Sequence, residues 1–255
     1  MGNFVNVSKE GKKKYLSITE NPFMKILAIE KKLSLHRFGF LRKYKQTQIF
    51  YDTQTNLLEK AGVALSKKIT PEKTYFKVER QSFLPQSLSR KNEKIFIHEV
   101  GTKDKVSDHA FYLVDGIKSL FTTSFTVDLE NVLKNITPKI TISSDVTEYQ
   151  VLSGGGFKAN LKFLQTNIKN LETKRKAKMV SVTTTLDCQE TYLPAFEYFN
   201  NQIEKYCKDL VPFEESLFDY THRLTKPLPV KKKLTKEEKE KLKQQAKKLN
   251  DTIEG

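Results

Sequence analysis

The stretch FYDTQTNLLEKAGVALSKK, residues 50–68, reads as a strand end, a turn, a short helix and a second strand. Asp52 stands where a carboxylate can fix the turn after the first strand. NLLEKAG is predicted to form a helical turn that ends at Gly62, and VAL opens the next strand. The stretch therefore predicts a compact strand–helix–strand unit. It ends in Ser66, Lys67 and Lys68, so the question is what these polar residues do on a strand.

The flanking segments extend this pattern of strands with a few helices. Residues 24–35, 73–80 and 93–100 alternate as strands do. Four more strands follow in KITISS, TEYQVLS, FKANLKFL and KMVSVTTTL, with SGGG at 153–156 as a hairpin turn. Residues 128–136, capped by Asp128, and the amphipathic stretch 195–210 are predicted helices. The fold class is α+β, and the polar face of its strands faces either solvent or the interior of a closed barrel.

Positive charge dominates the composition. The chain has 255 residues with 45 Lys and Arg against 30 Asp and Glu, a net charge of +15. Such a surface suits phosphate, nucleic acid, anionic lipid or an acidic protein partner. No apolar run is long enough to span a membrane. Cys188 and Cys207 make neither a disulfide framework nor a zinc site, so we expect reduced thiols in an intracellular protein, either cytoplasmic or mitochondrial.

Charge also suggests the domain organisation. Residues 1–20 are expected to form a basic N-terminal arm, 21–228 the folded domain and 229–255 a basic, helical C-terminal tail. Residues 231–250 hold nine lysines and three glutamates. The two basic ends are expected to contact RNA, lipid headgroups or an acidic partner.

The order AIEKK, FYDT…LLEKAGVALSKK, TYFKV and VSVTTTL resembles the CYTH, or triphosphate tunnel, superfamily, and most closely its thiamine-triphosphatase branch. The resemblance spans roughly residues 24–210. It implies an antiparallel eight-stranded β tunnel, a closed barrel flanked by helices. It also implies magnesium- or manganese-dependent chemistry on triphosphate substrates, with carboxylates holding the metal and basic side chains gripping the phosphates.

Several positions depart from the pattern that the resemblance implies. The first acid of the opening strand falls on Ala28, the closing pair of acids falls on Ser181 and Thr183, and an expected arginine falls on Ser66. One remaining carboxylate is a poor magnesium site, and lysine lacks the planar fork of arginine. We therefore predict no catalytic residue and no metal ligand. The candidate phosphate-binding residues are Glu30, Lys32, Lys68, Lys77 and Lys162.

Together these features predict a catalytically degenerate tunnel protein that serves as a non-catalytic subunit of a larger assembly. Two alternatives stay open. The protein could be a binding module for polyphosphate or nucleotide, or a surviving metal-dependent triphosphatase. Magnesium is expected as a cofactor only in the last case.

Overall fold

A computed structural model describes residues 2–8, 11–18, 36–80, 92–120, 127–213 and 217–225. The chain divides after Thr225 into two units, and all of the described residues lie in the first. The expected strand at 24–35 and the expected tail at 229–255 lie outside the described residues.

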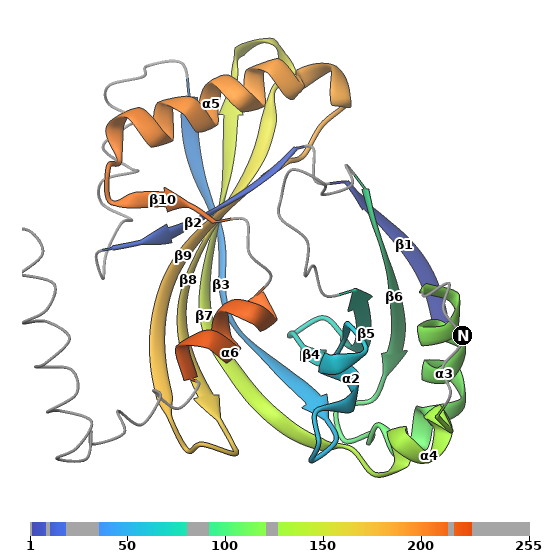
Figure 1. Ribbon diagram of the computed structural model, residues 1–255. Helices are drawn as coiled ribbons and strands as arrows, with labels where there is room; N and C mark the ends of the chain where they lie inside the picture. Colours follow the sequence, from blue (N-terminus) through green and yellow to red (C-terminus); the bar gives the residue numbers. More distant parts are fainter. Residues whose placement is uncertain are drawn as a thin grey trace, which may run out of the picture. The chain divides into compact units, whose positions relative to one another are not determined.

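A single antiparallel sheet of ten strands forms the centre of this unit (Figure 1). The strands are β1 (Gly2–Ser8), β2 (Lys12–Ser17), β3 (His36–Asp52), β4 (Val63–Ile69), β5 (Thr74–Arg80), β6 (Asn92–Val100), β7 (Thr137–Ser153), β8 (Lys158–Asn170), β9 (Lys176–Leu186) and β10 (Leu210–Pro212). Their order in the sheet is β1-β6-β5-β4-β3-β7-β8-β9-β2-β10. The class α+β is confirmed. The expected eight-stranded closed barrel is not, because β1 and β10 form two separate edges of the described sheet.

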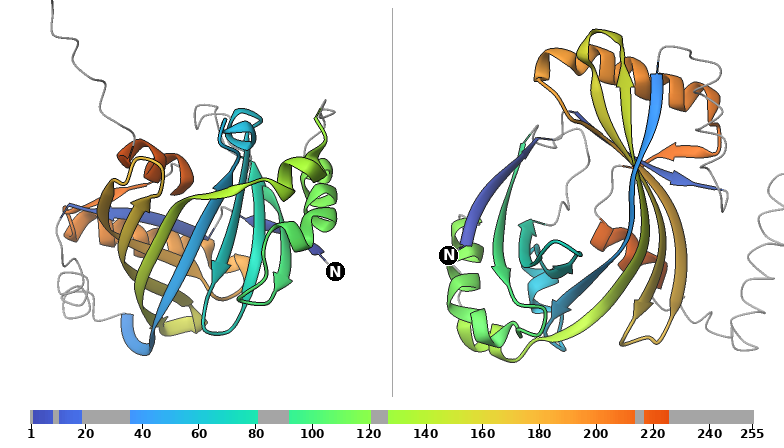
Figure 2. Two further views of the ribbon diagram at one scale, coloured as in Figure 1. Left: turned by 90° about the horizontal axis from the view of Figure 1, so that it is seen from below. Right: turned by 180° about the vertical axis from the view of Figure 1, so that it is seen from behind.

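The sheet is strongly curved, and helices cover both of its faces (Figures 1 and 2). The helices are α2 (Leu57–Lys60), α3 (Ala110–Leu120), α4 (Leu129–Lys134), α5 (Leu193–Tyr206) and α6 (Leu217–Thr225), with short 3-10 turns at Ser107–His109, Gly154–Gly156 and Glu190–Tyr192. None of the described helices is long and apolar enough to cross a membrane.

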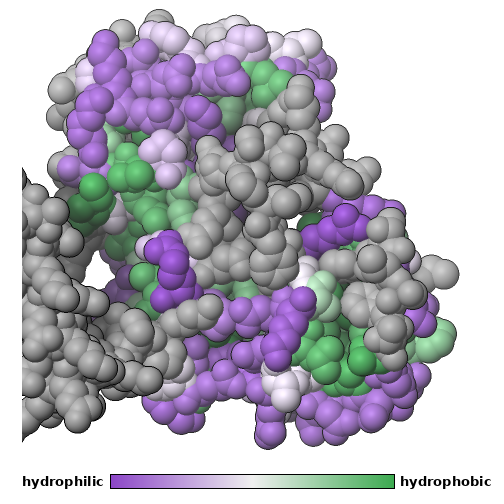
Figure 3. Space-filling model, viewed as in Figure 1, coloured by the Kyte–Doolittle hydropathy of each residue, from purple (hydrophilic) through white to green (hydrophobic). Residues whose placement is uncertain are grey.

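Two apolar cores lie on the convex face of the sheet. The α3–α4 pair packs against Phe76 and Phe96 of β5 and β6. At the other end, α5 buries Phe196 and Phe199 against β2, β8 and β9, and its outward side is hydrophilic in the space-filling view (Figure 3). For α5, the burial of apolar side chains three or four residues apart agrees with the amphipathic pattern in the sequence.

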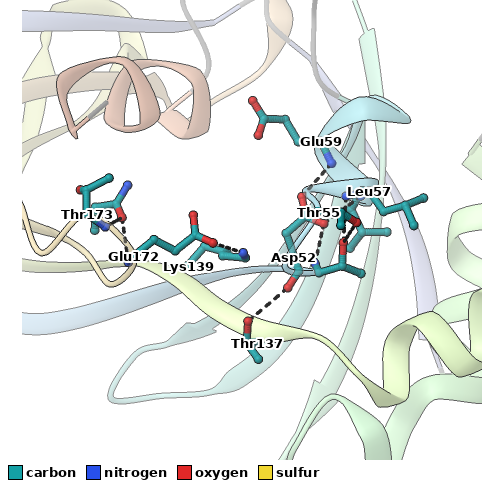
Figure 4. A network of polar contacts seen from close by, with 11 residues as sticks. Asp52, Thr55, Leu57, Glu59, Thr137, Lys139, Glu172 and Thr173 are labelled. Carbon is teal, nitrogen blue, oxygen red and sulfur yellow. Dashed lines mark hydrogen bonds and ion pairs between the residues drawn. The ribbon is translucent and has the colours of Figure 1, made fainter. Parts of the chain in front are cut away.

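The opening stretch folds as predicted around one buried carboxylate. Asp52 Oδ1 accepts from the backbone N–H groups of Thr53 (2.7 Å) and Leu58 (2.8 Å), and Oδ2 accepts from that of Glu59 (2.8 Å) (Figure 4). These bonds satisfy donors at the start of α2 that no intrahelical acceptor reaches. Gly62 then ends the turn with a φ of 74°, a conformation that glycine adopts without strain.

Near the start of the chain, residues 2–8 and 12–17 form strands where the sequence predicted a basic arm. Gly2–Ser8 pairs with β6, and Lys12–Ser17 lies between β9 and β10. The reason is visible at Tyr15, which is fully buried against α5, while Lys12 and Lys14 of the same strand face the opposite way. A short segment of mostly charged residues is therefore held in the sheet by one aromatic side chain.

Candidate functional site

A row of polar side chains crosses the concave face of the sheet. Strand register places Arg42 of β3 opposite Glu148 of β7, and Glu148 opposite Lys162 of β8. Thr183 of β9 lies between Lys162 and Lys14 of β2. Directly opposite residues on a sheet share one face, so this row extends across five strands.

Lysines from both halves of the sheet meet on this face. They are Lys12, Lys14, Lys68, Lys77 and Lys162, named here the lysine cluster. Burial, followed by the positive charges of Lys77, Lys12 and Lys162, lowers the pKa of Lys68 to about 8. Lys12 keeps substantial contact with solvent, yet burial of its ammonium and the charges of its neighbours also lower its pKa to about 8. The amines are thus close enough to repel one another.

That proximity requires the curvature of the sheet. Lys77 lies on β5 and Lys12 on β2, and six strand spacings separate these two strands in the sheet order. In a flat sheet the strands would lie about 29 Å apart, beyond a Debye length of about 8 Å at physiological salt. The charge of Lys77 nevertheless acts on Lys12. The sheet therefore curls until its two halves face each other across the concave side.

The carboxylates on this face are engaged in ion pairs. Glu148 accepts from Arg42 Nε (2.8 Å) and lies 3.0 Å from Lys162 Nζ. Burial would raise the pKa of Glu148, but the hydrogen bonds from these two cations outweigh it and lower the pKa. Glu79 pairs with Lys77. Among the described residues, neither Lys12 nor Lys68 has a carboxylate within ion-pair distance.

The two consecutive lysines of the opening stretch point to opposite faces of β4. Lys67 is buried on the convex side, where its Nζ donates to the backbone oxygens of Thr102 (2.8 Å) and Asp104 (2.6 Å). Lys68 points to the concave side. Its neighbour Ser66 faces the same way and accepts from Gln48 Nε2 (3.1 Å). One lysine therefore holds a loop, while the other belongs to the cluster.

The other end of the concave face is apolar and covered. Phe218 of α6 packs against Phe50 with ring centroids 5.0 Å apart, above a floor of aliphatic side chains from β7, β8 and β9. His222 Nδ1 lies 3.0 Å from Glu59 Oε1 of α2, and Asn170 Nδ2 donates to Thr225 Oγ1 (3.1 Å). Helix α6 thus bridges the two halves of the curled sheet at the end away from the lysine cluster.

The structure brings together three of the five candidate residues, Lys68, Lys77 and Lys162; Glu30 and Lys32 lie outside the described residues. Sequence reasoning missed Lys12 and Lys14. The signal for them was the alternation in KKKYL, residues 12–16: in a strand, Lys12 and Lys14 share one face and Tyr15 lies on the other. It also missed Arg42, Glu79 and Glu148. Thr183 lies in the row of polar side chains between Lys162 and Lys14. In the described part of the chain, no group of three or more His, Cys, Asp or Glu side chains lies together as metal ligands would.

No model of a known protein family matches the chain, and no curated protein does. Solved structures show distant similarity. A proposed adenylyl cyclase from Hippeastrum, described as having a dominant triphosphatase activity, is 14% identical over 86% of this chain and 98% of its own, with a TM-score of 0.47. A Pyrococcus horikoshii protein is 12% identical over 84% and 99%, with a TM-score of 0.46. A proposed adenylate cyclase from Bacillus halodurans is 13% identical over 83% and 96%, with a TM-score of 0.42. At this level of similarity, function has to be argued from the chain's own residues.

Proposed function

We propose that this protein is a divergent member of the triphosphate tunnel superfamily that binds a polyphosphate chain, free or carried by a nucleotide, on its lysine cluster without hydrolysing it. The observation that carries the proposal is the accumulation of like charge. Among the described residues, five lysines and one arginine face three glutamates, Glu79, Glu148 and the Arg42 partner Glu72, so cations outnumber carboxylates at the site. A polyanion would relieve the repulsion among these amines, because it supplies more counter-charge than the described carboxylates do.

A chain of linked phosphates suits the geometry better than a single phosphate. The amines come from β2, β4, β5 and β8, on both sides of the curled sheet. A ligand must reach both halves to neutralise them. Lysine ammonium groups act as point charges and accept several phosphate orientations, which favours a flexible, multiply charged chain.

Binding without hydrolysis is supported by the side chains that meet the cluster. Thr183, where the resemblance implies an acid, lies opposite Lys14 in register. Glu148 is already engaged in ion pairs with Arg42 and Lys162. Hard divalent cations need carboxylate oxygens that are free to ligate. The assembly-subunit role expected from the sequence stays a prediction, as does the thiamine-triphosphatase branch.

Calorimetry with sodium tripolyphosphate at pH 7 tests the binding proposal. We expect saturable binding by the wild type and an affinity loss of at least about tenfold in Lys68→Gln and in Lys162→Gln, each of which removes one charge. A matched control is Lys60→Gln on the exposed side of α2, which is expected to bind as the wild type does. Absence of binding heat would contradict the proposal.

Phosphate release tests the second half of the proposal. We expect no magnesium- or manganese-dependent release of phosphate from tripolyphosphate, ATP or thiamine triphosphate. Robust turnover that Glu30→Gln abolishes would show that a working metal site persists, and the protein would then be an enzyme rather than a binding module.

A further inference from the structure

The convex face of the sheet carries a second basic surface, separate from the lysine cluster. Between the part covered by α5 and the part covered by α3 and α4, strands β3, β7, β8 and β9 present side chains to solvent. The exposed residues here are Lys43, Lys45, Ser143, Gln165, Asn167, Lys169, Lys176 and Lys178, named the outer face. Strand register places all eight on the same side of the sheet.

The composition of the outer face is one-sided. Five of its eight residues are lysines, three are neutral amides or hydroxyls, and none is acidic or aromatic. The neighbouring Asp145 is only partly exposed and lies opposite Lys45 in register. In the described part of the chain, no carboxylate lies within ion-pair distance of the five lysines, whereas Lys134 and Lys139 elsewhere do have such partners. Among the described residues, five exposed lysines thus share this face with one partly exposed carboxylate, that of Asp145.

The spacing of these lysines suits a regular polyanion. Lys43 and Lys45 are two residues apart on β3, as are Lys176 and Lys178 on β9, which gives about 6.8 Å within each pair. Three strand spacings, about 14 Å, separate the two strands. The two pairs are offset along the strands, and Lys169, the amides and the hydroxyl lie on the strands between or beside them.

We propose that the outer face is a docking surface for double-stranded RNA. Single-stranded nucleic acid is usually held by aromatic side chains that stack on its bases, and the outer face has none. Sequence readout in the major groove needs a protruding helix or ribbon, and this surface is an open sheet. A-form RNA instead offers phosphates and 2′-hydroxyls along a wide, shallow minor groove. The lysines can neutralise the phosphates, while Ser143, Gln165 and Asn167 hydrogen-bond the 2′-hydroxyls.

Fluorescence anisotropy of a labelled 20-base-pair RNA duplex, titrated with the full chain, tests this proposal. We expect binding that weakens as salt increases. The double variant Lys45→Glu/Lys178→Glu should weaken binding by about tenfold or more and reduce the slope of log affinity against log salt by about one for each phosphate that is no longer neutralised. Because both residues are exposed, we expect the variant to keep its fold, and a thermal unfolding curve checks this.

Controls separate this surface from charge in general and from the lysine cluster. Lys60→Glu/Lys118→Glu places the same charge change on α2 and α3, away from the outer face, and should change the affinity by less than about twofold. Lys68→Met, which removes a residue of the lysine cluster, should leave RNA binding unchanged. A negative result for RNA binding is therefore distinct from a negative result for polyphosphate binding. An equal loss in the α2–α3 control, no duplex binding, or equal affinity for a DNA duplex of the same sequence would overturn the assignment.

Discussion

Lys68 shows how a residue of the proposed binding site affects stability. Its pKa is about 8 in the fold and 10.5 ordinarily. Between these values the unfolded chain binds more protons than the folded one, so the free energy of unfolding rises with pH across this window. Below pH 8 the folded protein carries the full cost of this ammonium. A binding residue that costs stability is what a site with unmatched charge implies.

We predict that Lys68→Met stabilises the free protein at pH 7, by on the order of 1 kcal/mol, and weakens tripolyphosphate binding. The stabilisation should shrink as pH approaches 10, because the wild-type amine then becomes neutral in the fold. Urea unfolding at pH 7 and pH 10 measures both values. Equal stability differences at the two pH values would contradict the electrostatic reason.

Lys67 provides the matched control one position away. Its amine donates to two backbone oxygens on the opposite face of the sheet. Lys67→Met should therefore destabilise the protein by about 1–3 kcal/mol, the cost of leaving buried acceptors unsatisfied, and leave tripolyphosphate affinity intact. A binding loss as large as that of Lys68→Met would mean that the two faces of β4 are not functionally distinct.

At the scale of elements, the α2 turn depends on Asp52. We predict that Asp52→Ala costs about 2 kcal/mol, because three buried or partly buried backbone donors lose their acceptor at once. Asp128→Ala is the comparison. Asp128 caps the exposed start of α4 with longer bonds of 3.1 and 3.2 Å, so we expect a cost nearer 0.5 kcal/mol. Urea unfolding midpoints should rank the two variants in this order; the reverse ranking would contradict it.

Local patterns accounted for most elements of the fold. The α2 turn, the Asp128 cap, the hairpin at 153–156 and the helix predicted at 195–210 all depend on neighbours in the chain. The first three are confirmed; the helix is found at Leu193–Tyr206, and Leu210 lies instead in β10. The strand β2 was missed because its pairing with β9 joins residues about 170 positions apart. Only the burial of Tyr15 against α5 separates this strand from a charged arm.

At the scale of the whole folded unit, the resemblance implied an eight-stranded closed barrel; the antiparallel sheet is confirmed, but the described sheet has ten strands and two separate edges. Alternation fixes which side chains share a face, and it placed Lys68, Lys77 and Lys162 on the same one. Whether the first and last strands meet depends on contacts between distant segments, which alternation does not encode. The ion pair between Glu148 and Arg42 was not predicted for the same reason, since the two residues lie 106 positions apart in the chain.

The central claim is that lysines from both halves of the sheet form one polyphosphate site, and calorimetric titration of the wild type with tripolyphosphate at pH 7 and pH 9.5 tests it most directly. Lys12 and Lys68 are protonated at the lower pH and largely neutral at the higher. We predict saturable binding at pH 7 and an affinity at least about tenfold lower at pH 9.5, since two unit charges are lost. Equal affinity at both pH values, or no binding heat at pH 7, would contradict the account.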